Sequence, residues 1–473
     1  MGKNKNKIRV KFVGNNSEHV TGSMTLIEIN DKKILIECGL IQGQGTVLAE
    51  YKANTKHFPF KPKTIDYIFV GHLHADHICG LPRLYANGCT AKIIAPKGTY
   101  EIAKILMEDS AFIMSKDVEM LKKKTERDYS PIYTKDNVKT CLQYWNEFDF
   151  NYPINLCEEI KFNFIKSGHI INSAQIELYI KNNNLTKKIL YTSDLGSNIP
   201  KYYADKFQPC EKANLVIGEC TYSSNKRNAT NKDRQNDLLK IKSVINEVCK
   251  INKGKVLIPS FALDRTQNII THLYNLFKDD KDCPLIIIDS PMAVKLTKLY
   301  EQLLDGEELE LYRKILNWDK LKFAEEYEES KFYQTSKEPM VLVSCSGMLS
   351  AGRSVTWCEK LLRNSNNCIL FIGFSAQNTL ATKIKQGKNK TIKINGKQVP
   401  NKCQIVDLKS FSSHMQHDDL LKYYSDIQTE KIALVHGDFN DKCDFTKELQ
   451  EEISKKNKTS KVVCVNKSTE LLL

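Results

Sequence analysis

The sequence predicts an α/β protein that folds as more than one domain. Its 473 residues exceed what a single core usually serves, and 41% of them are hydrophobic, which is enough for packed cores. The clearest pattern begins near residue 210, where short β-branched runs alternate with segments of helical periodicity. Such alternation is typical of parallel strands joined by crossover helices.

The expected elements follow the chain in order. Up to about residue 200 the strands are "MTLIEI", "KKILIEC", "YIFV", "KIIAP", "IELYI" and "KILYTSD". Residues 115–152 are charged and irregular, and we expect a solvated surface excursion there. Further on, "ANLVIGE", "KVLIPS", "PLIIID", "PMVLVSC" and "NCILFIGF" predict strands, and the helices are expected over 233–252, 264–278 and 291–304. Asn395-Gly396 predicts a hairpin turn, after which "CQIVDL" and "KIALVHGD" add the last strands.

Composition restricts the class of protein. No apolar run approaches the ~18 residues that span a bilayer, and the basic N-terminus leads into a strand rather than a signal peptide's apolar region. The 15 cysteines include no C-x-x-C pair, which favours reduced thiols and a cytoplasmic location. A net charge of +14 suits an anionic partner.

The segment "GHLHADHICG", residues 71–80, places His72, His74, Asp76 and His77 within six positions. The preceding "IDYIFV" predicts a buried strand, and "ICGLPRLYANG" predicts a helix that ends at Asn87-Gly88. The polar side chains therefore lie at a strand-to-helix turn, where several can point at one place. Imidazole and carboxylate groups together suit zinc or a similar divalent ion. We predict a metal site here.

Three further polar residues follow apolar strands in the same way. His169 comes after "FNFIKSG", Asp194 after "KILYTS" and His436 after "KIALV", each beside Gly or Ser. Because side chains at strand ends project into sites, we expect these residues to complete the metal centre. Four histidines lack this context and are expected to be ordinary surface or core residues: His19, His57, His272 and His417.

Six ordered motifs resemble those of the metallo-β-lactamase superfamily, in its β-CASP branch: "HLHADH", "SGHIINSA", "TSDLG", "GECTY", "FSSHMQHDDL" and "LVHGD". That branch includes the polyadenylation-factor endonuclease and its bacterial and archaeal relatives. The resemblance continues through "PSFALDRTQ", "DSPMA", "SCSGMLSAGR" and "GFSAQNTL", so it covers nearly the whole chain. It implies an αββα metallo-β-lactamase sandwich from residues 1–209 and 390–473, with an α/β β-CASP cap inserted over 210–389.

The resemblance also implies the roles of the site residues. One zinc ion would be bound by His72, His74 and His169 and a second by Asp76, His77 and His436, with Asp194 bridging both. Two Zn²⁺ per chain, about 3.5–4 Å apart, could share a hydroxide that attacks a phosphodiester. His414 matches the acid that protonates the leaving group, and Glu219 matches the carboxylate that orients it. Asp76 counts among the catalytic residues as well as among the ligands.

The sequence departs from the family pattern at two positions. Glu37 stands in "LIECGLIQG" where relatives usually have Asp, at a position that holds the metal ligands, and Asn172 replaces the more usual Gly. A Gly/Ser-rich turn after "PMVLVSC" is a good place for backbone amides to hold phosphate. We predict a grip on the RNA backbone there, by four residues: Ser344, Ser346, Gly347 and Arg353.

These features favour a zinc-dependent ribonuclease that hydrolyses single-stranded RNA by a two-metal hydroxide, leaving 3′-hydroxyl and 5′-phosphate ends, in RNA processing or decay. A small-molecule metallohydrolase of the same superfamily is one alternative, which the cap and His414 disfavour. An inactive RNA-binding scaffold subunit is another, which the seven intact ligands disfavour. Endo- and exonucleolytic action both stay open, as does a homodimer, and no membrane association is expected.

Overall fold

The computed structural model describes the chain except for residues 1–6, 183–184, 225–227, 374, 376–378 and 388–389. Part of the "GFSAQNTL" motif therefore lies outside the described residues. The chain forms two compact units. The first comprises Met1–Asn198, Ala204–Asn228 and Ser413–Leu473, and the second comprises Ile199–Tyr203 and Ala229–Ser412. Among the described helices, none combines the length and the apolar composition that crossing a bilayer requires.

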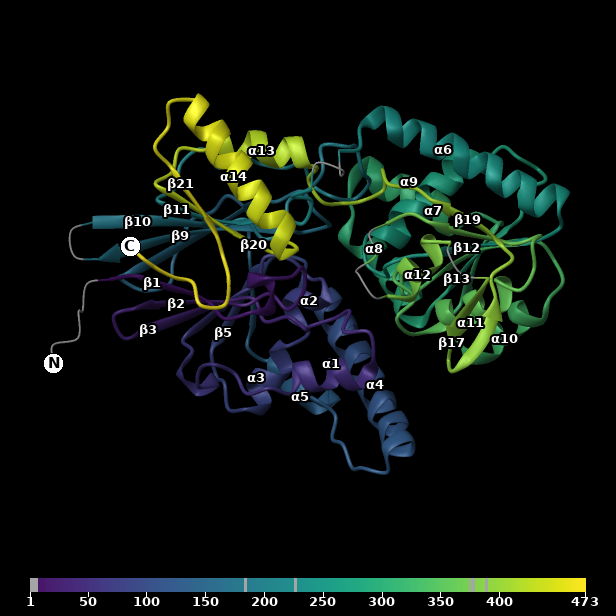
Figure 1. Ribbon diagram of the computed structural model, residues 1–473, viewed down its shortest axis with the longest axis horizontal. Coiled ribbons are helices and arrows are strands. Elements are labelled where there is room, and N and C mark those ends of the chain that lie inside the picture. Colours follow the sequence, from purple (N-terminus) through teal and green to yellow (C-terminus); the bar gives the residue numbers. More distant parts are fainter. Residues whose placement is uncertain (1–6, 183–184, 225–227, 374, 376–378, 388–389) are drawn as a thin grey trace. The chain divides into compact units, whose positions relative to one another are not determined.

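The first unit contains two seven-stranded sheets (Figure 1). In the first sheet the strand order is β22-β1-β2-β3-β4-β5-β6. Its strands are β1 (Arg9–Phe12), β2 (Thr25–Ile29), β3 (Lys32–Ile36), β4 (Tyr67–Phe69), β5 (Lys92–Pro96), β6 (Trp145–Phe148) and β22 (Glu470–Leu472). In the second sheet the order is β21-β20-β11-β10-β9-β8-β7. Its strands are β7 (Ile154–Asn155), β8 (Ile160–Lys166), β9 (Ala174–Asn182), β10 (Leu185–Tyr191), β11 (Leu215–Glu219), β20 (Lys431–Val435) and β21 (Lys461–Cys464).

One hydrophobic core fills the space between these sheets. Phe12, Ile27 and Phe69 from the first sheet join Phe162 and Ile176 from the second in a single buried cluster. Alternate residues of the strands supply this core, because successive side chains of a strand point to opposite faces. The two sheets therefore pack face to face, as the metallo-β-lactamase sandwich requires.

Helices cover both outer faces of the sandwich (Figure 1). Beside the first sheet lie α1 (Val47–Asn54), α2 (Ala75–Ile78), α3 (Leu81–Ala86), α4 (Tyr100–Thr125) and α5 (Lys135–Leu142). Beside the second lie α13 (His417–Asp426) and α14 (Phe439–Lys455). Short turns of 3-10 helix, η1 (Asn15–Ser17) and η2 (Pro62–Thr64), complete the unit. The αββα layering expected from the family resemblance is confirmed.

The segment 115–152 is largely solvent-exposed as far as residue 130, as expected, but the expected irregular structure is wrong. Helix α4 continues to Thr125, α5 follows, and β6 ends the segment. The buried face of α4 includes Met107, Met114 and Leu121, which are seven residues apart and so lie on one side of the helix. After Met114, lysines and acidic residues fill most of the other positions, and their density hides this sparse apolar stripe in the sequence.

The second unit is built on a six-stranded parallel sheet of order β14-β13-β15-β12-β16-β19. Its strands are β12 (Lys255–Pro259), β13 (Leu285–Asp289), β14 (Leu321–Ala324), β15 (Met340–Ser344), β16 (Cys368–Phe371) and β19 (Gln404–Asp407). The connecting helices are α6 (Asn231–Ile245), which continues into a π-helical turn η3 (Asn246–Ile251), α7 (Arg265–Phe277), α8 (Pro291–Leu303), α9 (Gly306–Leu316), α10 (Tyr327–Thr335), α11 (Arg353–Leu361) and α12 (Leu380–Lys385). The predicted parallel alternation is confirmed, and β17 (Thr391–Ile394) and β18 (Lys397–Pro400) form the predicted hairpin around Asn395-Gly396.

The unit boundaries lie later in the chain than the predicted 209/210 and 389/390. Strand β11 pairs with β10 and β20, so the residues after 209 complete the sandwich. Strand β19 pairs with β16, so the residues after 389 still belong to the parallel sheet of the second unit. The compact units change at Asn228/Ala229 and at Ser412/Ser413 instead.

Candidate metal centre

The predicted site residues lie at one edge of the second sheet of the sandwich. Strands β10, β11 and β20 are parallel, and β8 runs the same way because both β8 and β10 pair antiparallel with β9. His169 follows β8, Asp194 follows β10, Glu219 ends β11 and His436 follows β20. The common strand direction therefore brings together four side chains that are far apart in sequence.

The first sheet adds the "HLHADH" segment through the end of β4. The carbonyl of Gly71 accepts a hydrogen bond from Ala174 N at 2.8 Å, which ties this segment to β9. A Cβ at Gly71 would lie 2.5 Å from Ser193 Oγ, so only glycine allows so close an approach. His72 and His74 then follow, and α2 begins at Ala75 and carries Asp76 and His77.

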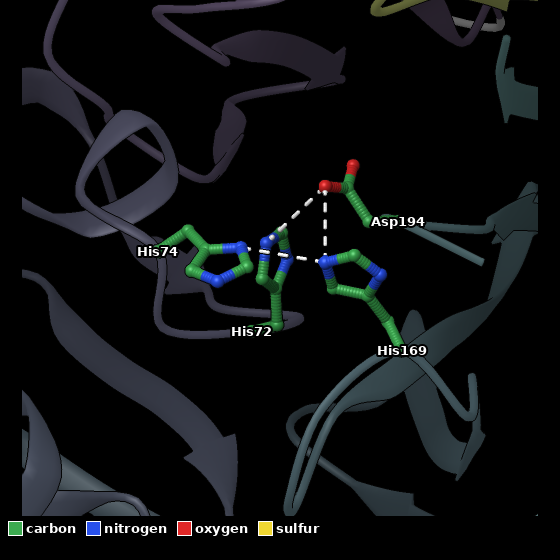
Figure 2. A group of neighbouring side chains, drawn as sticks. All are labelled: His72, His74, His169 and Asp194. Carbon is green, nitrogen blue, oxygen red and sulfur yellow. Dashed lines mark hydrogen bonds and ion pairs between the residues drawn. The ribbon is translucent and has the colours of Figure 1, made fainter. Parts of the chain in front are cut away.

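One group of ligands consists of His72, His74, His169 and Asp194 (Figure 2). His74 Nδ1 lies 3.3 Å from His169 Nε2. Asp194 Oδ2 lies 3.4 Å from His72 Nε2 and 3.6 Å from His169 Nε2. The four side chains thus point their donor atoms at one place.

A second group consists of Asp76, His77 and His436. His77 Nε2 lies 3.3 Å from His436 Nε2, and Asp76 Oδ2 lies 3.6 and 3.4 Å from these two nitrogen atoms. The other oxygen of Asp194, Oδ1, lies 3.6 Å from His77 Nε2 and 3.3 Å from His436 Nδ1. Asp194 therefore turns one carboxylate oxygen toward each group.

These residues fit a pair of divalent metal ions. Within the described part of the chain, the buried atoms His72 Nε2 and Asp194 Oδ1 make no hydrogen bond. Buried polar atoms without partners cost free energy unless a ligand satisfies them. Imidazole nitrogen and carboxylate oxygen are also the donors that zinc takes in catalytic sites.

The protonation of two ligands differs in the metal-free site. Burial, followed by the repulsion of His77, holds the pKa of His72 well below its ordinary value. Burial acts on His77 in the same direction, but the Glu37 and Asp194 carboxylates outweigh it and raise the pKa of His77 to about 10. Because a metal binds neutral imidazole, His72 is ready to bind whereas His77 must release a proton.

Glu37 holds one ligand from each group. Its Oε2 accepts hydrogen bonds from His77 Nδ1 and from Tyr191 Oη, both at 2.6 Å. Its Oε1 accepts from Ser193 Oγ at 2.9 Å, and Ser193 Oγ pairs with His72 Nδ1 at 2.9 Å. Occupying Nδ1 in this way leaves the Nε2 atoms of both histidines for a metal. The glutamate, fully buried, thus makes the ligand-holding contacts in spite of its extra methylene.

Several of these supporting residues were missed by sequence reasoning. Tyr191 precedes the "TSD" motif and Ser193 is its serine, but neither carried a metal-site signal of its own. Thr221 is similar: its Oγ1 lies 2.9 Å from His436 Nδ1. Their only signal is adjacency, since each lies within three residues of Asp194 or Glu219.

The loop that carries His169 explains the second departure from the family pattern. Ser173 Oγ accepts hydrogen bonds from the backbone N–H groups of His169 at 3.0 Å and Ile170 at 3.1 Å. Asn172 has a φ of 55°, the left-handed conformation that favours glycine and that asparagine tolerates best among other residues. The substitution of Asn for Gly therefore keeps the loop.

His414 and Glu219 lie beside the metal ligands. His414 Nδ1 is 3.5 Å from Glu219 Oε1 and 3.8 Å from Asp194 Oδ2. Glu219 is fixed by the backbone N–H groups of Leu195 at 3.1 Å and Thr221 at 2.7 Å. Burial would raise the pKa of Glu219, but the hydrogen bond and the charge of His414 lower it below its ordinary value. The His414 side chain is 16% exposed, whereas those of His72 and His169 are at most 1% exposed, so His414 is open to a substrate.

The four histidines set aside in the sequence lie outside the ligand groups found among the described residues. His417 contacts Asp418 at 2.9 Å and Glu448 at 3.1 Å through its two ring nitrogens. His272 belongs to the second unit, where its Nε2 lies 3.3 Å from Arg234. Burial, with Arg234, lowers the pKa of His272 to about 3.

The chain is similar to known protein families over most of its length. The family described as "Beta-Casp domain" matches residues 266–384, "Zn-dependent metallo-hydrolase RNA specificity domain" matches 398–460, and "Anti-Pycsar protein Apyc1" matches 12–232. The chain is 27% identical to Ribonuclease TTHA0252 of Thermus thermophilus, over 89% of this chain and 91% of that protein. The chain belongs to the β-CASP branch of the metallo-β-lactamase superfamily. As a member of this family it is an enzyme, a metallo-hydrolase.

Two other relatives are named as a transcription termination factor and as a subunit of a complex. The chain is 26% identical to Transcription termination factor FttA of Methanocaldococcus jannaschii, over 93% of this chain and 68% of that protein. It is 23% identical to Integrator complex subunit 11 of Danio rerio, over 92% and 70%. A crystal structure of a protein of unknown function from Enterococcus faecalis has a TM-score of 0.53 at 12% identity, covering 99% of this chain and 100% of that one, and supports the fold alone.

The second unit contains the β-CASP match and the four predicted substrate-binding residues. Ser344 Oγ donates to the backbone carbonyl of Asp289 at 2.7 Å. Arg353 Nη1 donates to Asp289 Oδ1 and to the carbonyl of Ala324, both at 2.8 Å. The structure therefore places Ser344 and Arg353 in contacts that hold the turn together. The turn itself is formed by Ser346 and Gly347, and Ser346 Oγ lies 2.9 Å from Ser350 Oγ. The proposed contact of these four residues with the RNA backbone stays a prediction.

Proposed function

We propose that this protein is a zinc-dependent ribonuclease that hydrolyses the phosphodiester bonds of single-stranded RNA and leaves 3′-hydroxyl and 5′-phosphate ends. The observation that carries the proposal is the position of Asp194. One of its oxygen atoms faces His72 and His169, and the other faces His77 and His436. A carboxylate shared in this way suits two ions side by side, and sites of two metals recur in enzymes that cleave phosphate esters.

Each residue of the centre has a task in the proposed reaction. When bound, the two ions would supply Lewis acidity and lower the pKa of a water molecule, so that water can attack phosphorus at neutral pH. Attack breaks the bond between phosphorus and the 3′ oxygen, which then needs a proton. His414 is exposed to substrate, and its Nδ1 lies 3.5 Å from Glu219 Oε1, so it is placed to give that proton. Glu37, Ser193 and Thr221 keep the histidine ligands in one orientation.

The choice of RNA rests on the relatives and on charge. Two of the relatives are named a ribonuclease and a transcription termination factor, and one matched family is described by its RNA specificity. The net charge of +14 favours a polyanionic substrate. A small-molecule hydrolase would have no need of the large β-CASP unit, and a scaffold subunit would have no need of seven intact ligands. Ser346 and Gly347 are the residues of the β-CASP turn that we propose to face the RNA backbone.

The test is an RNA cleavage assay in which the nucleophile is identified. An RNA carrying a single 2′-deoxy sugar at the scissile position should still be cut there, because water attacks and the 2′-hydroxyl does not. In heavy-oxygen water the label should appear on the new 5′-phosphate. A chelator should stop cleavage and added zinc should restore it. Resistance of the single-deoxy RNA, with a cyclic phosphate product from the normal RNA, would refute the proposal.

A further inference from the structure

A hollow of about 270 Å³ lies on the surface of the sandwich unit, and none of the residues to which a reaction has been assigned lines it. We call it the Phe58 hollow. Its wall includes Cys38, Gly39, Arg83 and Lys467, together with Phe58 and other residues of the segment before η2. All of these residues belong to the first unit, so the hollow is complete within it.

The Phe58 hollow is basic. No aspartate or glutamate lines it, whereas Lys56, His57, Arg83 and Lys467 do. Lys467 is paired with Glu18 at 3.3 Å, but Lys56 and Arg83 form no ion pair within the described residues. Unpaired cations beside a cavity attract an anionic ligand, because no protein carboxylate neutralises them.

Aromatic rings lie among these charges. Phe58 and Phe60 are stacked, with ring centroids 5.6 Å apart and an interplanar angle of 26°. The guanidinium of Arg83 lies 4.4 Å from the centroid of Phe58. Arg83 Nη2 also donates to the carbonyls of Thr55 at 3.1 Å and Lys56 at 2.5 Å, so it holds the loop in which Phe58 lies. Both phenylalanines remain partly exposed.

The same loop continues the positive charge beyond the hollow. Residues 55–63 read "TKHFPFKPK", and Lys61 and Lys63 are exposed and, like Lys56, lack an ion pair in the described part of the chain. The three lysines lie at separate positions along this segment, two in the loop and Lys63 in the 3-10 turn η2 that ends it. Such spacing suits successive phosphates of a chain better than one small anion. Aromatic faces interleaved with cations are the usual platform for single-stranded nucleic acid, in which bases stack and phosphates pair.

The Phe58 hollow shares a wall with the metal centre. Cys38 N donates to the carbonyl of His77 at 2.8 Å, and Leu40 N donates to the carbonyl of Ala75 at 3.1 Å. Cys38 and Leu40 line the hollow, and the same backbone bonds hold the turn that carries Asp76 and His77. A ligand in the hollow is therefore next to the segment that presents two metal ligands.

We propose that the Phe58 hollow and residues 55–63 form a binding subsite for a single-stranded segment of RNA outside the cleavage centre, with one base against Phe58 and phosphates on Lys56, Lys61 and Lys63. The inference rests on the proposed ribonuclease function, which it extends by assigning part of the substrate's path. The subsite would make affinity depend on RNA length, since only a strand that reaches the loop gains these contacts.

The first test measures the salt dependence of RNA binding by fluorescence anisotropy. The triple variant Lys56→Gln, Lys61→Gln, Lys63→Gln is compared with a control, Lys7→Gln, Lys123→Gln, Lys124→Gln, which removes equal charge from exposed positions elsewhere in the same unit. Each lost phosphate contact to a single strand lowers the log–log salt slope by about 0.7, so the test variant should lose about 2 and the control almost nothing. Equal slopes in the two variants would overturn the proposal.

The second test separates stacking from charge. Phe58→Leu should weaken binding of an RNA of about 16 nucleotides on the order of 10-fold, and Phe58→Trp should restore it, because an indole also stacks on a base. Metal content and circular dichroism check that the variants are folded.

The outcomes distinguish this inference from the function on which it rests. If the wild-type protein cleaves RNA and all variants bind long RNA equally, the subsite is refuted and the ribonuclease stands. If the wild-type protein neither binds nor cleaves RNA, the proposed function itself fails. If inorganic phosphate or a mononucleotide competes fully with long RNA at the Phe58 hollow, the ligand is a small anion and the extended path is wrong.

Discussion

Shortening Glu37 to the aspartate usual in the family should weaken metal binding in this protein. The wild-type carboxylate reaches both His77 Nδ1 and Tyr191 Oη at 2.6 Å, and Ser193 Oγ at 2.9 Å. Glu37→Asp withdraws the carboxylate by one carbon–carbon bond, about 1.5 Å. Contacts of 2.6 Å would then lengthen beyond hydrogen-bond range unless the backbone moved. The backbone has little room to move, because residue 37 already has a φ of 60° and lies fully buried.

The size of the effect follows from the contacts that are lost. A hydrogen bond to a charged group contributes about 1.5–3 kcal/mol. Losing the bond that orients His77 therefore corresponds to a factor of roughly 10 to 100 in affinity, at about 1.4 kcal/mol for each factor of ten. The same range, about 10–100-fold, is typical when a residue behind a metal ligand is replaced. Glu37→Gln keeps the length but loses the charge, so it should fall in this range as well.

The assay is a metal titration against a chromophoric chelator, with Glu28→Gln as the matched control. Glu28 is a partly exposed carboxylate that pairs with Lys11 at 2.8 Å and with Lys33 at 3.4 Å. It has no assigned part in holding the metal ligands. Its variant should bind metal as the wild type does. If Glu37→Asp and Glu37→Gln both bind as tightly as Glu28→Gln, the reasoning that Glu37 orients His77 and His72 is refuted.

Four further outcomes are expected. Asp194→Ala should lose most of both metals by elemental analysis, because one carboxylate faces both groups; retention of two metals per chain would contradict its shared position. His414→Gln should keep the metals and lower kcat by ~10²-fold or more, as for a lost general acid; loss of one metal would instead make it a ligand. Metal uptake should release protons and tighten as the pH rises toward the His77 pKa of about 10, since the bound imidazole must be neutral; an affinity independent of pH between about 7 and 9 would contradict this. Lys442→Met should lower the free energy of unfolding by about 2 kcal/mol or more, because the fully buried ammonium donates to two backbone carbonyls that would be left unpaired; an unchanged urea midpoint would show that these carbonyls find other partners.

The local sequence indicated the candidate metal ligands because these residues lie in local contexts that can be read. His72 to His77 occupy a strand-to-helix turn, and His169, Asp194 and His436 each follow an apolar strand. An apolar strand followed by a polar residue beside Gly or Ser can be recognised from about ten residues of sequence, without knowing which strands lie next to it. The convergence of these residues was expected from their strand-end positions and from the family motifs, and the structure brings them into two groups that both face Asp194.

The supporting contacts could not be read in this way. Tyr191 meets Glu37 across 154 positions of sequence, and Thr221 meets His436 across 215. Neither residue has a local pattern that distinguishes it from other polar residues near strand ends. The pairing of β11 with β20 brings Thr221 to His436, whereas Tyr191 reaches Glu37 because the two sheets pack face to face.

By itself, the sequence determined the α/β class, the order of the parallel strands in the chain and the identity of the candidate ligands, because strand length, helical period and ligand chemistry are local properties. The tertiary structure decided where the units divide, since β11 and β19 resemble each other as apolar strands and differ only in which sheet they join. It also decided that α4 is a continuous helix, whose sparse apolar stripe gains its stability from packing and not from composition. Long-range pairing and burial are non-local, and a single sequence carries no direct record of them.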